Sequence, residues 1–426
     1  MSRTKCAGIA GVVTILLLSC VMLSFAEETQ TPSYTVPFGD GYDEMTISQI
    51  DLAGDLERQI VVDREKGQYL GHPTTALMGD GKTIFCVYPN EHGKGPIFMK
   101  KSTDAGLTWS ERLPTPKSWE TNRMAPMIFR LTDAHGKARV FVFSGTRDEG
   151  PYTPVRAAVS EDEGATWSEL EPLGTWGGVM GMTDIVPVNG KPGHYMAMFF
   201  DDGGEFISGS DHFAENRKKY PGIKGHIFTD LVKSYTEDGG VTWSFPESVF
   251  KSFDCHLIEP GIVRSPDGKR LAVLLRENSR QYNSQIIFSD DEGKTWTEPR
   301  PLPASLCGDR HTVRYTNDGR LIVSFRDLPP RRLKSKTPSL GDWIAWVGTW
   351  DDLVEGRQGQ YRIRLADNYV NGDCAYPGVI VLKDGTIVLT TYGHWVEGEK
   401  PYIITIRLDL SEMDAKCKEL KSNSNE

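Results

Sequence analysis

The chain has 426 residues and a formal net charge of −10, with 25% charged and 38% hydrophobic residues. This composition is typical of a soluble globular protein, and one large domain is favoured because a repeat runs through most of the chain. The negative charge disfavours nucleic acid and anionic membranes as partners, and an anionic small substrate would need a local arginine cluster.

The N-terminal residues have the pattern of a targeting segment. Two basic residues precede the apolar run 7–23, and a small-x-small cleavage site ends at Ala26. We predict a signal peptide over 1–26, a polar leader over 27–45, and a secreted or periplasmic protein without stable membrane insertion after cleavage. A lipoprotein anchored through Cys20 is the alternative, because the residues before it resemble a lipoprotein signal.

The remaining cysteines do not form a recognisable site. They are Cys86, Cys255, Cys307, Cys374 and Cys417. Their number is odd, no CxxC pair occurs, and no His/Cys spacing fits zinc. We expect isolated buried thiols, and neither a metal nor another cofactor.

Short strands dominate the rest of the chain. Six apolar runs lie at 83–88, 138–143, 194–200, 270–275, 320–325 and 386–391. Each follows a turn, and most of these turns carry residues that tolerate positive φ, as hairpins require. No long segment has a helical period, so the pattern predicts an all-β fold.

One eight-residue phrase, Ser/Thr-x-Asp-x-Gly-x-Thr-Trp, occurs four times. The copies lie at 102–109, 160–167, 236–243 and 289–296, and residues 349–352 resemble a degenerate copy. In such a turn the Asp accepts backbone hydrogen bonds, the Gly takes positive φ and the Trp packs against the body, so we interpret the phrase as structural. Six units of four strands predict a six-bladed β-propeller over 46–412, followed by a polar tail over 413–426.

The phrase and the first turn of each unit lie at one end of the propeller. The start of the first strand and the end of the second strand of each unit lie at the other end, so side chains of all units converge there. Four of them stand nine positions before a turn glycine: His72, Glu259, Arg310 and Tyr376. Others follow the second strand of a unit: Glu91, Arg147, Asp202, Arg276 and Arg326. This end is therefore the predicted functional rim.

The repeats and the rim together resemble the sialidase superfamily, with its Asp boxes, over roughly residues 60–410. In that family a Tyr activated by a Glu attacks the anomeric carbon, an Asp is the acid/base, and three Arg bind the sugar carboxylate. The resemblance implies that Tyr376 is the nucleophile or an electrostatic stabiliser, that Glu259 is its base, and that Arg276 is the second Arg.

The chain departs from the family at three stations. His72 stands where the first Arg is expected, Gly341-Asp342 where the third is, and Lys94-Gly-Pro96 where the acid/base Asp is. Candidates to substitute for the missing arginines are Arg310, Arg326, Arg331 and Arg332. Candidates for the acid are Glu91, His92, Asp148 and Asp202, of which we prefer Glu91 and Asp202. We assign substrate binding to Arg276, Arg310, His311, His72, Arg326 and Arg147.

These features predict an exo-glycoside hydrolase that releases terminal sialic acid or a related acidic sugar from a glycan or glycoconjugate. A different exo-glycosidase, a lyase for uronic acids and a non-catalytic glycan-binding propeller are the alternatives. A hydrolase needs a deep central pocket with Tyr376 and Glu259 within hydrogen-bond reach, whereas a binding module would present a shallow aromatic platform.

Overall fold

The computed structural model describes residues 42–145, 154–202, 218, 228–370 and 372–423. The chain divides into two compact units, 1–32 and 33–426, and all described residues belong to the second. The predicted signal peptide and Cys20 therefore lie outside the described residues. Within the described part, no helix is long and apolar enough to cross a membrane.

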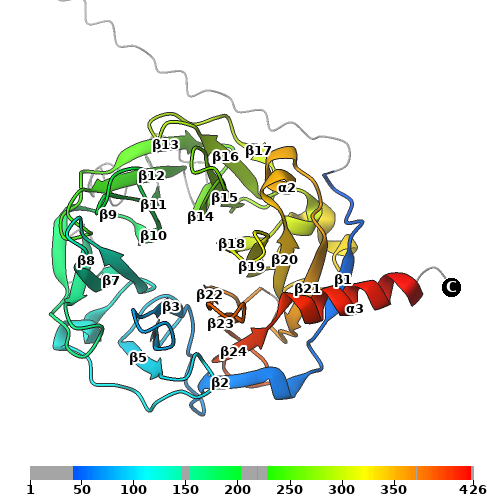
Figure 1. Cartoon of the computed structure of the whole chain (residues 1–426), viewed down its shortest axis with the longest axis horizontal. Helices are drawn as coiled ribbons and strands as arrows, with labels where there is room; N and C mark the ends of the chain where they lie inside the picture. Colours follow the sequence, from blue (N-terminus) through cyan, green and yellow to red (C-terminus); the bar gives the residue numbers. More distant parts are fainter. Residues whose placement is uncertain (1–41, 146–153, 203–217, 219–227, 371, 424–426) are drawn as a thin grey trace, which may run out of the picture. The chain divides into compact units, whose positions relative to one another are not determined.

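Six sheets of the second unit lie in a ring, with strands β3, β10, β14, β18 and β22 nearest its centre (Figure 1). We number the sheets as blades 1 to 6 in chain order. Blade 1 contains β3 (Thr74–Leu77), β4 (Ile84–Pro89) and β5 (Ile97–Ser102). Blade 2 contains β6 (Met127–Thr132), β7 (Ala138–Gly145), β8 (Pro154–Ser160) and β9 (Glu171–Gly177). Blade 3 contains β10 (Val179–Pro187), β11 (Tyr195–Asp202), β12 (Thr229–Thr236) and β13 (Glu247–Ser252).

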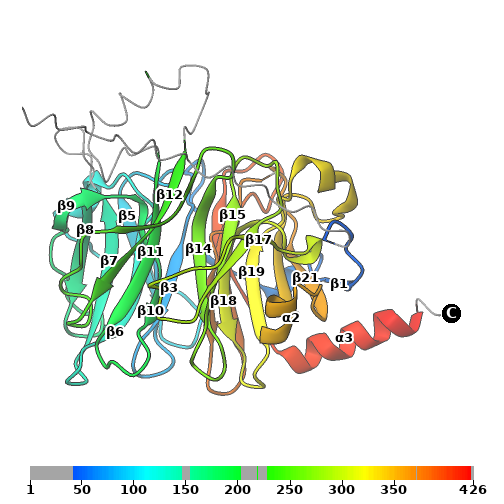
Figure 2. The ribbon, with the colours of Figure 1, turned by 90° about the horizontal axis from the view of Figure 1, so that it is seen from above.

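The second half of the ring repeats this order and confirms the predicted all-β, six-bladed propeller. Blade 4 contains β14 (Leu257–Arg264), β15 (Leu271–Glu277), β16 (Gln285–Ser289) and β17 (Arg300–Pro301). Blade 5 contains β18 (Asp309–Tyr315), β19 (Leu321–Arg326), β20 (Trp343–Gly348) and β21 (Tyr361–Ala366). Blade 6 contains β22 (Gly378–Val381), β23 (Ile387–Gly393) and β24 (Tyr402–Leu408). Successive strands of a blade are antiparallel neighbours that run between the two ends of the ring (Figure 2).

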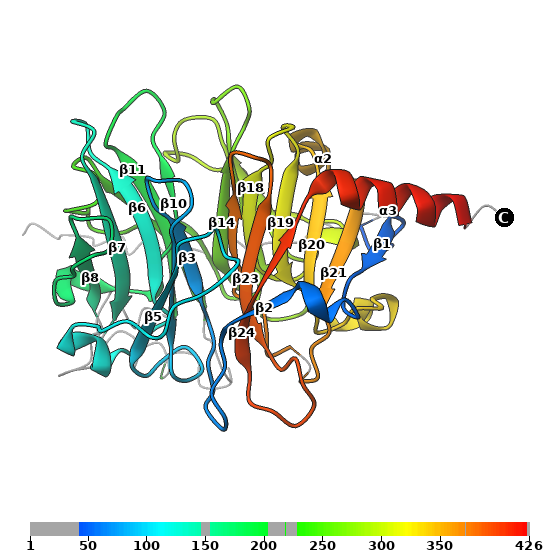
Figure 3. The same ribbon diagram turned by 60° about the horizontal axis from the view of Figure 1, so that its bottom comes forward.

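Two N-terminal strands complete the last blades. Strand β2 (Gln59–Asp63) pairs antiparallel with β24, and β1 (Ser48–Asp51) pairs in parallel with β21 (Figure 3). Strand β2, which precedes blade 1, and the last strand β24 thus share one sheet, so hydrogen bonds close the ring. Pairing also covers the edges that β21 and β24 would otherwise leave exposed.

Each Asp box is a turn that its own side chains hold together. In the second copy, Ser160 Oγ donates to Asp162 Oδ1 at 2.8 Å, and Gly164 N donates to Ser160 Oγ at 2.8 Å. The backbone N–H of Thr166 donates to Asp162 Oδ1 at 2.8 Å. The other three copies repeat these bonds. The structural interpretation of the phrase is therefore confirmed.

The boxes also form the contacts between blades. A Cβ added at Gly164 of blade 2 would lie 2.4 Å from Phe85 of blade 1. At Gly240 of blade 3 it would lie 2.6 Å from Leu131 of blade 2. The glycines are required because each box packs its backbone directly on the preceding blade.

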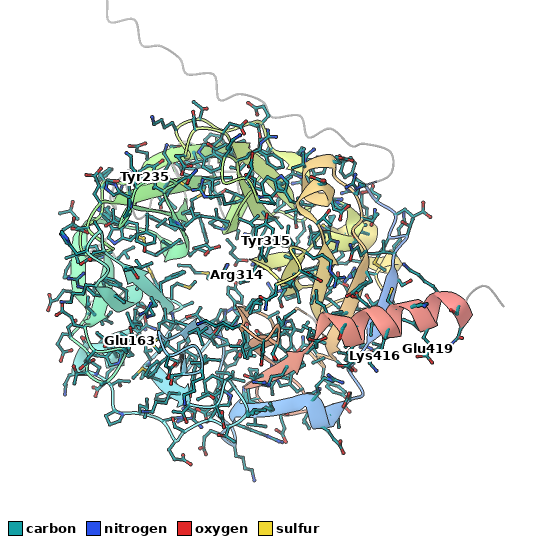
Figure 4. The ribbon with its side chains drawn as sticks, in the orientation of Figure 1. Glu163, Tyr235, Arg314, Tyr315, Lys416 and Glu419 are labelled. Atoms are coloured by element: carbon teal, nitrogen blue, oxygen red, sulfur yellow. The ribbon has the colours of Figure 1, made fainter. Side chains whose placement is uncertain are left out.

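Two short segments differ from the sequence predictions. Residues 349–352 do not form a box: Thr349 caps helix α2 (Trp350–Glu355), where Asp352 N donates to its Oγ1 at 3.2 Å. Residues 413–423 of the predicted polar tail instead belong to helix α3 (Leu410–Asn423), in which Leu410, Met413 and Cys417 bury one face at helical spacing. Lys416 and Glu419 lie on α3 outside the ring of sheets (Figure 4).

Short 3-10 turns also lie between strands of the described part. They are η1 (Leu56–Arg58), η2 (Lys117–Thr121), η3 (Ala304–Leu306) and η4 (Arg331–Lys336). The five cysteines of the described residues are all free and buried, as the sequence predicted.

Substitution of a box glycine tests the contact between blades. Gly164 and Gly81 both have positive φ, +88° and +73°, but only Gly164 faces a neighbouring blade, since nothing lies within 4 Å of a Cβ at Gly81. We expect Gly164→Ala to lose about 1–3 kcal/mol more unfolding free energy than Gly81→Ala, because of overpacking against Phe85. Urea unfolding of the two variants measures the difference. Equal losses would show that backbone strain alone requires the glycine.

Candidate active site

A cavity of about 400 Å³ opens among residues from five blades. Its lining consists of His72, His92, Gly93, Lys94, Arg123, Met124, Ala125, Val179, Met180, Phe200, Glu259 and Tyr376. The volume falls in the range of small-ligand sites. A larger hollow of about 650 Å³ lies against α3, but the acidic group in its lining, Asp414, is bonded to Arg320 and Tyr361. The first cavity is therefore the candidate active site.

Tyr376 and Glu259 form the hydrogen bond that the sequence predicted. Tyr376 Oη donates to Glu259 Oε1 at 2.5 Å, and both side chains are buried. Burial raises the pKa of Tyr376 well above its ordinary value, and the Glu259 carboxylate raises it further. Tyr376 is therefore a neutral phenol near neutral pH, with its proton directed at a carboxylate.

A bulge at the start of the inner strands brings these residues together. His72, Glu259 and Arg310 have left-handed φ values of 52°, 53° and 54°. In β14 and β18 the pairing register shifts where Glu259 and Arg310 stand. Such bulges re-aim side chains and often occur beside active sites. In blade 6 the left-handed residue is Ala375, at φ 54°, one position before Tyr376.

Asp309 is a central residue of this region that sequence reasoning missed. Its carboxylate is fully buried and accepts from both Nη atoms of Arg280 at 2.5 Å and from Arg326 Nη2 at 2.5 Å. Arg276 Nε lies 3.3 Å from Asp309 Oδ1, while Arg276 Nη1 donates to Glu259 Oε1 at 2.8 Å. Burial would raise the pKa of Asp309, but the three arginines outweigh it and hold this pKa well below its ordinary value.

The predicted substrate-binding arginines therefore differ in their surroundings. Arg276 and Arg326 are bonded to carboxylates of the protein itself. Arg310 is buried and donates from Nη2 to the carbonyl oxygen of Thr183 at 3.1 Å, while its Nε has no partner within the described part of the chain. Glu259 Oε2 is likewise buried without a partner there. Arg310 Nε and Glu259 Oε2 are thus buried polar atoms whose hydrogen-bonding capacity the described residues leave unused.

His72 replaces the expected arginine with a neutral ring. Gly93 N donates to His72 Nδ1 at 3.1 Å, so the proton of the neutral ring is on Nε2. Burial lowers the pKa of His72 well below its ordinary value. Its ring centroid lies 4.2 Å from that of Tyr376 and 4.4 Å from that of His92. His72 is therefore a packing and donor group at the cavity wall, not a second cation.

Five predicted residues are not among those that line the cavity: Arg276, Arg310 and Arg326, which lie in the cluster beside it, and His311 and Glu91. His311 Nε2 lies 3.0 Å from the carbonyl oxygen of Leu306, its ring stacks on Phe325, and burial lowers its pKa to about 4. It is a core residue because its strand turns it away from the rim. Glu91 is exposed, and its Oε2 lies 3.6 Å from Lys94 Nζ.

The remaining predictions cannot be placed by their side chains. Arg147 and Asp148 lie outside the described residues. Asp202 ends β11 opposite Thr229, and its side chain is also outside the described part. Among the described residues, no group of three or more His, Cys, Asp or Glu could hold a metal ion.

Comparisons with known proteins agree with this architecture. The family model described as a BNR repeat-like domain matches residues 120–389, more than half of the chain. A sialidase of Micromonospora viridifaciens is 23% identical over 320 residues, which cover 69% of this chain and 44% of that protein. The chain spans about half the length of the curated relatives it matches.

Two solved structures share the fold at low sequence identity. An α-L-arabinofuranosidase from Fusarium graminearum has a TM-score of 0.58 and 12% identity, covering 83% of this chain and 98% of its own. A Hadza microbial sialidase has a TM-score of 0.53 and 15% identity, covering 81% of this chain and 66% of its own. The shared feature is the six-bladed propeller.

Neutralising Asp309 tests whether it holds the buried arginines in place. We expect Asp309→Asn to lose about 3–5 kcal/mol of unfolding free energy, because it leaves buried guanidinium charges uncompensated. Glu161→Gln is the matched control, since Glu161 is 61% exposed and pairs with Lys137 at the surface, and its loss should stay within about 1 kcal/mol. Denaturant unfolding measures both. Similar small losses would mean that the arginines do not depend on Asp309.

Proposed function

This chain belongs to the family of the BNR repeat-like domain, as a divergent member of the sialidase-like superfamily, and we propose that it is an exo-acting glycoside hydrolase. The observation that carries the proposal is the 2.5 Å hydrogen bond between Tyr376 and Glu259 in the wall of a central cavity. A non-catalytic glycan-binding propeller would not require a buried phenol bonded to a buried carboxylate. The cavity, rather than an open aromatic platform, also favours an enzyme.

The reaction follows from the proton position. Tyr376 Oη attacks the anomeric carbon, its proton passes to Glu259 Oε1, and the bond to the leaving oxygen breaks as that oxygen takes a proton from an acid. Water then attacks the anomeric carbon and gives one proton to the conjugate base of that acid, while the bond from this carbon to Tyr376 Oη breaks and Glu259 returns the proton to Tyr376. The anomeric configuration is retained, because two displacements occur at one carbon.

Arg276 and Glu259 Oε2 have supporting roles in this scheme. Arg276 binds Glu259 Oε1 at 2.8 Å and so keeps the carboxylate directed at Tyr376. The unpartnered Oε2 can accept a hydroxyl of the bound sugar, which would satisfy a buried acceptor only in the complex. In this scheme Glu259 both binds the sugar, through Oε2, and takes the proton of Tyr376, through Oε1.

Our first substrate proposal is a terminal sialic acid or related acidic sugar. Lys94 and Arg123 line the cavity. Arg310 lies close enough to Glu259 and Tyr376 to interact with both electrostatically. These cations supply the local positive field that an anionic sugar needs on a protein of net charge −10. The guanidinium groups proposed to bind the sugar carboxylate are those of Arg123, in the cavity lining, and Arg310, behind Glu259 and Tyr376.

A neutral terminal sugar is the second candidate, and Asp309 favours it. The carboxylate of Asp309 already occupies Arg280 and Arg326 in the way that an acidic ligand would. A bidentate site that is filled by the protein is closed to a substrate carboxylate. A lyase for uronic acids, an alternative that the sequence left open, would also need a free site for a substrate carboxylate.

A substrate panel with one variant separates these candidates. Wild-type protein is incubated with α2,3- and α2,6-sialyllactose and with neutral 4-nitrophenyl glycosides, including the α-L-arabinofuranoside, and the released sugar is quantified. We expect turnover on one class, and a fall in kcat of about 10³-fold or more in Tyr376→Phe, the scale expected when a covalent nucleophile is removed. Tyr315→Phe is the control, since its hydroxyl binds the carbonyl oxygen of Arg264 outside the cavity lining.

Each outcome has a distinct meaning. Release of sialic acid supports the acidic substrate, and turnover of neutral glycosides alone replaces it with the second candidate. Equal rates in wild type and Tyr376→Phe would remove Tyr376 from the mechanism. No release from any glycoside would contradict the hydrolase proposal.

Export is part of the proposal as well. If the predicted signal 1–26 is cleaved, mass spectrometry of the exported protein should find Glu27 as the first residue. A diacylglyceryl modification on Cys20 would instead establish the lipoprotein alternative. An intact Met1 in the exported fraction would contradict both.

A further inference from the structure

The proposed reaction leaves one role open, the acid that protonates the leaving oxygen. Besides Tyr376 and Glu259, the described titratable groups of the cavity lining are Lys94, Arg123, His72 and His92. Lys and Arg hold their protons too tightly to be good acids near neutral pH. His72 is buried with Nδ1 occupied by Gly93 N–H. His92 remains as the candidate for the acid, and its hydrogen bonds indicate which of its nitrogens could give a proton.

Hydrogen bonds determine which nitrogen of His92 carries a proton. Tyr69 Oη lies 2.7 Å from His92 Nδ1 and 2.8 Å from Asp373 Oδ1. Tyr69 has one proton, and the ionised carboxylate can only accept, so that proton goes to Asp373. His92 Nδ1 must then donate to Tyr69. Nε2 is left as the nitrogen that can gain or release a proton.

Asp373 is held ionised and fixed by several donors. His394 Nε2 lies 3.0 Å from its Oδ2, and Tyr392 Oη donates to its Oδ1 at 3.1 Å. Burial would raise the pKa of Asp373, but the bonds from His394, His92 and Tyr69 outweigh it and hold the pKa well below its ordinary value. Asp373 therefore orients His92 both directly, with Oδ1 3.4 Å from His92 Nδ1, and through Tyr69, as the third member of a catalytic triad orients its base.

The position of His92 suits a group that meets the leaving side of a substrate. Its side chain is 64% exposed and belongs to the cavity lining. Its ring lies edge-on to His72, which in turn packs on Tyr376. His92 thus stands at the mouth of the cavity, and Tyr376 in its wall.

We propose that His92 is the general acid and base of this site, with Tyr69 and Asp373 as its positioning residues; this inference rests on the proposed glycosidase function. Protonated His92 gives its Nε2 proton to the glycosidic oxygen as the bond to the anomeric carbon breaks. In the second step the neutral ring takes a proton from the attacking water, which regenerates His92 in its first state. No other reactant is needed.

Leaving-group dependence tests this role. His92→Gln is compared with wild type on an alkyl glycoside and on the 2,4-dinitrophenyl glycoside of the same sugar. We expect kcat/KM to fall about 10²–10⁴-fold on the alkyl glycoside, because proton donation is lost. The loss on the dinitrophenyl glycoside should be small, because dinitrophenolate leaves without a proton. A burst of dinitrophenol and rescue by azide should follow, since the water step lacks its base.

Control variants separate His92 from its neighbours. His135→Gln changes an exposed histidine of a turn outside the cavity lining and should leave both rates unchanged. Tyr69→Phe should show the leaving-group signature of His92→Gln in weaker form, while a purely structural role would reduce both rates equally. Equal loss on both substrates in His92→Gln, or the signature in Glu91→Gln instead, would overturn the proposal.

A glycosyl fluoride distinguishes failure of this inference from failure of the proposed function. Fluoride leaves without acid, so a glycosyl fluoride with a second fluorine on the carbon next to the anomeric carbon should label Tyr376 in wild type and in His92→Gln alike, as peptide mass spectrometry would show. Labelling of both proteins with undiminished alkyl hydrolysis in His92→Gln would overturn only the role of His92. Absence of labelling in wild type would overturn the Tyr376 mechanism and this role together.

Discussion

The carboxylate of Asp309 is the charge on which the rest of the site depends. It is buried in blade 5, where it binds Arg280 of the segment after β15 and Arg326 of β19. Arg326 also donates to the carbonyl oxygen of Cys374, just before β22. One ionised group thus connects blades 4, 5 and 6 where Glu259 and Tyr376 meet. Without it, several guanidinium groups would lie in a poorly solvated interior with too little negative charge.

The same cluster explains how a weak nucleophile can be used. Arg276 lies between Asp309 and Glu259, so the direction of the Glu259 carboxylate follows from the position of Asp309. Glu259 in turn accepts the proton of Tyr376, whose pKa burial has raised. A phenol that is hard to ionise becomes reactive when its proton has a fixed acceptor at 2.5 Å. The buried ion pairs therefore affect the proposed reaction by fixing the direction of the Glu259 carboxylate toward Tyr376.

The two ends of the propeller divide stability from chemistry. Asp boxes pack glycine backbone against the preceding blade at one end, as Gly164 does on Phe85. At the other end, bulges with left-handed φ at Glu259 and Arg310 turn side chains toward the centre. Strained backbone is tolerated there because the blades on either side hold it in place. Regular repeats therefore position an irregular site.

The sequence by itself determined the all-β propeller, the structural role of the Asp boxes and the pairing of Tyr376 with Glu259. Repeats and nine-residue offsets are local patterns, and they translate directly into strands, turns and register. Only the tertiary structure decided that Asp309 neutralises the arginines, that His311 is a core residue, and that His92 rather than Glu91 lines the cavity. These outcomes depend on contacts between side chains far apart in the chain and on the direction in which a side chain leaves a bulged strand or turn. The spacing of residues along the sequence indicates neither.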